Sequence, residues 1–128
     1  MSVAVAEVTL ATQPAWIGLL RAIEAEVRPH DPTAATQAES GVRASLKQFD
    51  FTQSDSCWIV LAEVSGSPAG YAAAVRIPKA DARTGFVFVD ELYVLHAYRR
   101  SGVATALLKY IEQVVRVVCA PHFLSHIV

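Results

Sequence analysis

Two arginines, Arg99 and Arg100, stand just before the point at which we expect a helix to begin at Gly102. The first backbone amides of a helix have no acceptor within the helix, and the helix dipole adds partial positive charge there. Gly102 lets a ligand approach the backbone closely, and Ser101 and Thr105 add hydroxyl donors. This combination predicts a binding corner for a phosphate or pyrophosphate.

The corner does not match the common nucleotide-binding motifs. No glycine-rich loop ends in Lys followed by Ser or Thr, which excludes a P-loop. No GxGxxG follows the first expected strand, which disfavours a dinucleotide-binding fold. Two alternatives remain open: a site for some other phosphate ligand, or a chance glycine cap beside two solvated arginines.

An acidic pair, Asp90 and Glu91, interrupts the otherwise apolar segment 86–95 (FVFVDELYVL). That segment is typical of a strand, in which consecutive side chains point to opposite faces. Both carboxylates therefore face one cleft only if a β-bulge intervenes.

The elements that must position these residues follow from periodicity and turn chemistry. The sequence predicts a strand over 3–12 and a helix from Pro14 to Arg28 with a buried face, then a helix over 31–49 capped by Asp31. Strands over 57–64 and 70–77 form a hairpin through the turn 65–68, and residues 78–85 form the next turn. The strand over 86–95 and a helix over 102–118 follow, with a possible last strand over 121–128. The expected buried faces consist of Trp16, Leu19, Leu20, Ile23 and Val27 on the first helix, and Val103, Leu107, Leu108, Ile111 and Val115 on the last.

This order describes one mixed α/β domain over residues 1–128. Within it, the run Arg99-Arg100-Ser101-Gly102-Val103-Ala104 resembles the R/Q-x-x-G-x-G/A signature of the GNAT superfamily of acyl-CoA-dependent N-acyltransferases. Glu91 to Val94, and Tyr98 directly before the signature, are similar to that family's fourth strand and the loop after it. The resemblance implies the order β-α-α-β-β-β-α-β, without the family's usual final helix and two strands.

The resemblance also implies acetyl-CoA as acyl donor, with no metal. The coenzyme A pyrophosphate would be held by Arg99, Arg100, Ser101, Gly102, Val103, Ala104 and Thr105. The pantetheine arm would lie along Leu92, Tyr93 and Val94.

In this family an amine attacks the thioester directly, and a carboxylate commonly takes its proton. By resemblance to polyamine acetyltransferases, which carry an acidic pair at the matching place, Glu91 is expected to be the base or amine anchor, with Asp90 second. The alternative is that one or both are solvated, or are paired with Arg76 or Arg99. His30 and Trp16 fall where the family's acceptor pocket often gains side chains, although Trp16 is equally explained as core.

The implied function is transfer of an acetyl group from acetyl-CoA to a small-molecule or peptide primary amine. The family often uses a tyrosine on a later helix as general acid, and no tyrosine follows Tyr110 here. The alternative function is therefore a non-catalytic acyl-CoA-binding module.

Charge and composition constrain the partners and the compartment. The net charge of -1 and pI near 6.4 give no general reason to expect nucleic acid or an anionic membrane as partner. No apolar run approaches a membrane span, and residues 1–12 lack Lys and Arg. Cys57 and Cys119 lie in apolar stretches, as in reduced cytoplasmic proteins. Apolar residues near the end, such as Phe123, predict a homodimer that covers them.

Overall fold

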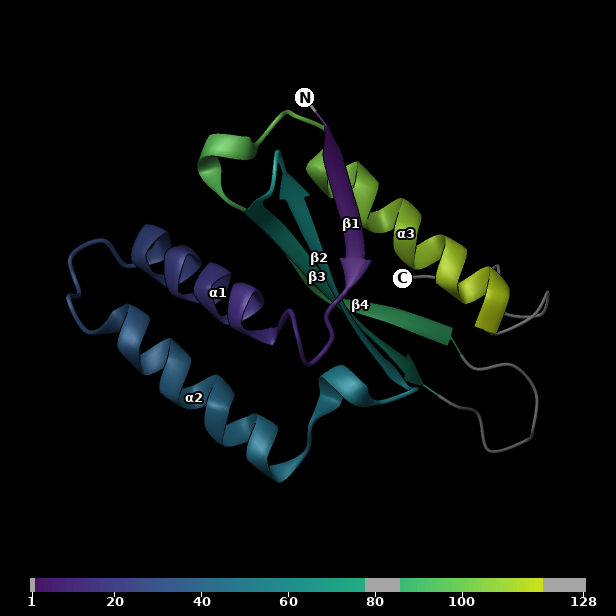
Figure 1. Cartoon of the computed structure of the whole chain (residues 1–128), viewed down its shortest axis with the longest axis horizontal. Coiled ribbons are helices and arrows are strands. Elements are labelled where there is room, and N and C mark those ends of the chain that lie inside the picture. The colour runs from purple at the N-terminus through teal and green to yellow at the C-terminus, as the bar shows by residue number, and fades with distance from the viewer. Residues whose placement is uncertain (1, 78–85, 119–128) are drawn as a thin grey trace.

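The computed structural model describes residues 2–77 and 86–118, and Figure 1 shows the arrangement of their helices and strands. The element order is β1 (Val3–Glu7), α1 (Gln13–Val27), α2 (Ala34–Gln48), a 3₁₀ turn η1 (Phe51–Gln53), β2 (Cys57–Val64), β3 (Ser67–Ile77), β4 (Phe86–Val94), a 3₁₀ turn η2 (His96–Tyr98) and α3 (Val103–Val118). The predicted turn over 78–85, the predicted strand over 121–128 and Cys119 lie outside the described residues.

The described strands form one sheet in the order β1-β2-β3-β4, antiparallel at every pairing. Helices α1 and α2 cover one face of this sheet and α3 covers the other (Figure 1). The α+β architecture agrees with the prediction. The parallel pairing that would make the sheet mixed depends on the strand predicted over 121–128.

The core has two layers because the strands of the hairpin are apolar on both faces. Val60, Ala62 and Val87 face α3, whose Leu107 and Ile111 are fully buried against them. On the other face Ile59, Leu61 and Tyr71 pack against the buried α1 side chains Trp16, Leu19 and Ile23. Burying such side chains contributes about 1.5–3 kcal/mol each and fixes the helices on the sheet.

Two element boundaries differ from the prediction because polar side chains bond locally. β1 ends at Glu7, since Thr9 N–H donates to Thr12 Oγ1 at 2.7 Å and starts a turn. Asp31 Oδ1 accepts from the backbone N–H of Thr33 at 2.9 Å, so it caps a turn and α2 begins later. Such short-range bonds compete with regular structure.

Two predicted core positions are wrong. Val27 is 53% exposed at the end of α1, and Leu108 is 43% exposed beside the buried Leu107. Cys57, expected in the core, is a half-buried free thiol.

The β2–β3 hairpin turns on two residues, Ser65 and Gly66, with φ of 52° and 83°. Positive φ at both positions is typical of the tight turn that matches strand twist. The turn is thus shorter than the predicted 65–68, and Pro68 already pairs with Glu63.

A β-bulge lies in β4 at Asp90. Ala73 pairs with Glu91 and Ala74 pairs with Val89, which leaves Asp90 as an extra residue. Val89 packs on the α3 side, so alternation turns Asp90 toward the α1 side, where Glu91 also lies. The bulge is the condition under which both carboxylates share a face.

Candidate functional site: an anion-binding corner and an adjoining pocket

The start of α3 forms a corner of unbonded amides. The amide of Ala106 donates to Gly102 O at 3.0 Å, so the amides of Val103, Ala104 and Thr105 precede the first intrahelical bond. Arg100 has φ of 64° and Gly102 has φ of 80°, and these left-handed residues turn the loop into the helix. A β-branched residue is strained in that conformation, which explains the glycine.

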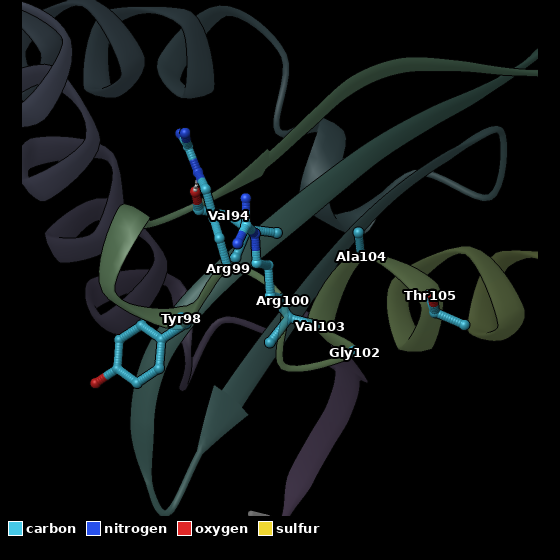
Figure 2. A pocket seen from close by; sticks show the side chains of 8 residues that line it. All are labelled: Val94, Tyr98, Arg99, Arg100, Gly102, Val103, Ala104 and Thr105. Carbon is cyan, nitrogen blue, oxygen red and sulfur yellow. Dashed lines mark hydrogen bonds between the residues drawn. The ribbon is translucent and has the colours of Figure 1, made fainter.

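A cavity of about 210 Å³ occupies this corner. Figure 2 shows its lining, which consists of Val94, Tyr98, Arg99, Arg100, Gly102, Val103, Ala104 and Thr105. Of the residues predicted to hold a pyrophosphate, all but Ser101 line the cavity. Ser101 lies in the same loop but outside the lining.

The two arginines have different roles. Arg99 Nε donates to Val94 O at 3.0 Å, and Figure 2 shows the Arg99 side chain turned to this carbonyl. The Arg99 guanidinium also lies 5.3 Å from the centre of the Tyr93 ring. Arg100 has no hydrogen bond or ion pair with any residue in 2–77 or 86–118, so its charge is available to a ligand.

Glu26, near the end of α1, holds the loop in place. Its carboxylate accepts from Tyr93 Oη at 2.7 Å and from His96 N at 2.9 Å, and lies 3.8 Å from Arg99. The Tyr93 hydrogen bond, helped by the His96 amide and the Arg99 charge, lowers the pKa of Glu26 below its ordinary value. The sequence did not single out Glu26, because a glutamate on a helix is ordinarily solvated. His96 contributes its backbone amide to this arrangement.

No described strand pairs with the outer edge of β4, although Arg99 Nε donates to Val94 O on that side. Leu95 N donates to Ala69 O at 2.8 Å, which directs its backbone toward β3. Antiparallel pairing alternates, so the backbone groups of Leu92 and Val94 point the other way. These are two of the three residues predicted to line a pantetheine arm. The side chain of the third, Tyr93, is bound to Glu26.

β4 is held tightly against β3 where this edge approaches the corner. A Cβ on Gly70 would lie 2.7 Å from Tyr93 O, so only glycine allows this approach.

A second cavity, of about 340 Å³, lies on the α1 side of the sheet. Its lining is Trp16, Leu20, Ile23, Glu24, Ala38, Val42, Ser45, Phe51, Tyr71 and Glu91. We call it the α1–α2 pocket. It includes Glu91 and Trp16 from the sequence prediction; Asp90 and the exposed His30 are not in the lining.

The polar end of the α1–α2 pocket is a tyrosine–carboxylate pair. Tyr71 Oη donates to Glu91 Oε1 at 3.1 Å. Burial raises the pKa of Tyr71 far above its ordinary value of 10.0, and the negative charges of Glu91, Asp90 and Glu24 raise it further. Tyr71 therefore stays a neutral donor. Glu91 is exposed to solvent and accepts this one hydrogen bond, and it is not ion-paired with Arg99, which turns to Glu26.

Trp16 serves both the core and the α1–α2 pocket. It is 3% exposed, and its ring meets Phe51 and Tyr71 edge to face at centroid distances of 6.0 and 6.1 Å. Its buried Nε1 has no hydrogen-bond partner in the described part of the chain. Such an orphan donor is uncommon in a folded protein.

The corner fits a pyrophosphate on chemical grounds: consecutive unbonded amides, a free guanidinium and a hydroxyl on Thr105 surround one cavity. Among the described residues no helix is long and apolar enough to cross a bilayer. Nor do three or more His, Cys, Asp or Glu side chains gather there as a metal site would require.

Comparison with solved structures shows the same fold. An aminoglycoside acetyltransferase from an uncultured soil metagenomic sample has a TM-score of 0.69 at 20% identity, covering 100% of this chain and 78% of its own. A ribosomal-protein-alanine N-acetyltransferase from Brucella melitensis biovar Abortus 2308 has a TM-score of 0.68 at 21% identity, covering 100% and 79%. AAC(6')-Iy, in complex with the bisubstrate analogue CoA-S-monomethyl-acetylneamine, has a TM-score of 0.66 at 18% identity, covering 100% and 78%.

A search of curated protein sequences finds no match. The model of the acetyltransferase (GNAT) family matches residues 17–125, which include most of α1, the hairpin, β4 and the signature loop. The chain therefore belongs to the GNAT acetyltransferase family.

Proposed function

We propose that the protein is an N-acetyltransferase that moves an acetyl group from acetyl-CoA to a primary amine by direct attack. The observation that carries the proposal is the adjacency of two features. The cavity, with its unbonded amides and with Arg100, which has no partner among the described residues, lies next to the strand-free outer edge of β4 at Leu92 and the N–H of Val94. Family membership and a structural neighbour in complex with a CoA analogue support acetyl-CoA as the donor.

The chain's residues divide the work of binding. The amides of Val103 to Thr105 and the Arg100 guanidinium would hold the pyrophosphate, and the edge of β4 would pair with the pantetheine amides. Bound acetyl-CoA supplies a thioester whose carbonyl carbon accepts an amine nitrogen as the carbon–sulfur bond breaks. Arg99, held by Glu26, keeps the loop in its binding shape.

Glu91 is proposed to receive the amine and its proton. An alkylammonium has a pKa near that of lysine, about 10.4, and must lose a proton to become nucleophilic. Glu91 Oε1 already accepts from Tyr71, which fixes the direction of the carboxylate. Asp90 adds negative charge from the bulge, without lining the pocket. Water can reprotonate the departing thiolate.

The second candidate is a binding module that holds acyl-CoA without turnover. The feature that favours it lies within the described residues: the hydroxyls of Tyr93 and Tyr110 donate to Glu26 and Glu7, so neither is placed to protonate a departing thiolate.

Calorimetric titration with acetyl-CoA tests the donor site, with Gly102→Val as the variant and Gly66→Val as its matched control. Both glycines have positive φ, and neither has a heavy atom within 4 Å of an added Cβ. Each substitution therefore costs about 1–3 kcal/mol of backbone strain without a clash. Only Gly102 lies in the corner.

Wild type and Gly66→Val should bind one acetyl-CoA per chain, and Gly102→Val should bind at least roughly tenfold more weakly. Equal affinity in the two folded variants would refute the corner as donor site. Release of free thiol in the presence of amines then separates the enzyme from the binding module, which binds without releasing thiol.

A further inference from the structure

The α1–α2 pocket combines six apolar or aromatic side chains with four polar ones, two of which are carboxylates. Its wall consists largely of Trp16, Leu20, Ile23, Val42 and Phe51, which offer a ligand no side-chain hydrogen bond at their exposed surface. The rings of Trp16, Phe51 and Tyr71 meet edge to face and make one side of this wall rigid. An apolar cavity with a few convergent polar groups is typical of a small-molecule site.

Of the two carboxylates in the lining, Glu91 has no cationic partner among the described residues. Glu24 lies 3.5 Å from Arg28, but no arginine, lysine or histidine among residues 2–77 and 86–118 lies within ion-pair distance of Glu91. Tyr71 supplies Glu91 with one neutral hydrogen bond and leaves its charge in place. A carboxylate in this setting attracts an ammonium group, and the attraction strengthens as water is displaced.

The pocket offers a polar ligand few hydrogen-bonding or ion-pairing partners, and this makes it selective. Each hydroxyl or second ammonium of a polyhydroxylated or polycationic amine loses water on entering and needs a protein partner in return. Beyond Glu24, Ser45, Tyr71 and Glu91 the lining provides none. A sugar-like or polyamine body would therefore be penalised against the aromatic wall, whereas a ring would be favoured there.

We infer that the acceptor is a small primary monoamine with an aromatic or similarly apolar body, its ammonium group at Glu91 and its body against Trp16 and Phe51. The inference rests on the proposed function and names the substrate class of the same site. It differs from the substrates in the names of two structural neighbours, which are aminoglycosides and a ribosomal protein.

The test uses 2-phenylethylamine against ethanolamine, spermidine and the aminoglycoside sisomicin. Thiol release from acetyl-CoA gives kcat/KM for each amine, and calorimetry without acetyl-CoA gives the affinity of each amine by itself. We expect 2-phenylethylamine to exceed ethanolamine by about 100-fold in kcat/KM, because only the former buries a ring. The kcat/KM values of spermidine and sisomicin should be close to that of ethanolamine.

Ala38→Leu is the pocket variant and Ala44→Leu its control on the same helix. Ala38 lines the pocket, so a leucine there fills the space of the amine body, whereas Ala44 is exposed and outside the lining. Ala38→Leu should lower kcat/KM for 2-phenylethylamine at least roughly tenfold and leave acetyl-CoA affinity unchanged. Ala44→Leu should behave as wild type.

The failures are distinguishable. In one outcome 2-phenylethylamine binds, Ala38→Leu weakens that binding, and acetyl-CoA does not bind. The ligand class inferred for the pocket would then stand, and the proposed acetyltransferase activity would be refuted. In another outcome acetyl-CoA binds, but spermidine or sisomicin has the highest kcat/KM, or all amines have the same kcat/KM. This would overturn the inference and leave the proposed function standing. Equal kinetics of Ala38→Leu and Ala44→Leu would also overturn it, because the amine would then bind elsewhere.

Discussion

At the residue scale, the chemistry proposed for the amine depends on one carboxylate with a fixed orientation. Glu91 is oriented by Tyr71, and its charge has no compensating cation in the described part of the chain. The neighbouring Asp90 is exposed, as Glu91 is, but it lies outside the pocket lining, although its charge reaches Tyr71. The two acids of one dipeptide thus have different environments, which separates their expected roles.

Glu91→Gln should lower kcat roughly 100-fold while acetyl-CoA affinity stays nearly unchanged, because the amide keeps the shape and loses the basic oxygen. Steady-state thiol release and calorimetry on the same sample measure the two quantities. Asp90→Asn is the matched control and should reduce kcat far less. Comparable losses in both variants would mean that total negative charge, rather than Glu91 as base, supports the reaction.

Sequence reasoning found the residues of the corner because the signature is local: Arg100, Gly102 and the first amides of α3 are adjacent in the chain. Its assignment of Arg99 to the phosphates stays a prediction: Arg99 lines the cavity, and its side chain also contacts Val94 O and Glu26. Glu26 is 73 residues before Arg99 in the numbering, and no local pattern connects them. Only the packing of α1 beside β4 brings the two together.

At the element scale, the bulge in β4 places the carboxylates of Asp90 and Glu91 on the same face of the sheet. Periodicity predicted α1, α3 and the hairpin, because apolar side chains repeat along each of them, whereas α2 was predicted from the cap and first-turn pair Asp31-Pro32. The bulge itself has no periodic signal, since Asp90 and Glu91 read as an ordinary alternation until the pairing with Ala73 and Ala74 is known. The early end of β1 was missed for a similar reason, because the Thr9–Thr12 hydrogen bond competes with a strand-like pattern.

Deletion of Asp90 tests the bulge apart from the charge. Without Asp90, Val89 and Glu91 become consecutive and still face opposite sides, so the strand can pair regularly with β3 and fold. The local kink and added twist that aim Glu91 would be lost. We expect a folded protein with kcat reduced at least roughly tenfold.

Asp90→Ala is the control for this deletion, because it removes the same carboxylate and keeps the extra backbone residue. Its kcat should stay within about threefold of wild type, and thermal unfolding should verify that both variants fold. Equal kcat for deletion and substitution would show that the bulge does not aim Glu91.

At the scale of the whole molecule, Glu26 connects the two proposed sites. The α1–α2 pocket is lined by residues of α1, α2 and the sheet, and the anion-binding corner lies between the end of β4 and the start of α3; Figure 1 shows where these elements lie. Glu26 belongs to the helix that lines the pocket, yet its partners Tyr93, His96 and Arg99 belong to the segment that forms the corner. The homodimer expected from Phe123 and its neighbours concerns residues outside the described part and stays a prediction.

Glu26→Gln should therefore weaken acetyl-CoA binding roughly tenfold, the equivalent of about 1.4 kcal/mol, although Glu26 does not touch the ligand.

The same substitution, Glu26→Gln, should also change the pH dependence of the free energy of unfolding. A carboxyl whose pKa is lowered on folding stabilises the protein at pH values above the ordinary pKa of 4.5. This contribution is lost as the pH falls through the lowered pKa. Wild type should exceed Glu26→Gln in free energy of unfolding at pH 7, and the difference should shrink in urea titrations at about pH 3.

Glu112→Gln is the control, because it breaks an exposed ion pair with Arg116 on α3, 2.7 Å long. It should change neither the acetyl-CoA affinity nor the free energy of unfolding measurably. If both variants bound acetyl-CoA like wild type, Glu26 would be a surface residue that merely lies near the loop, and the corner would keep its shape without α1.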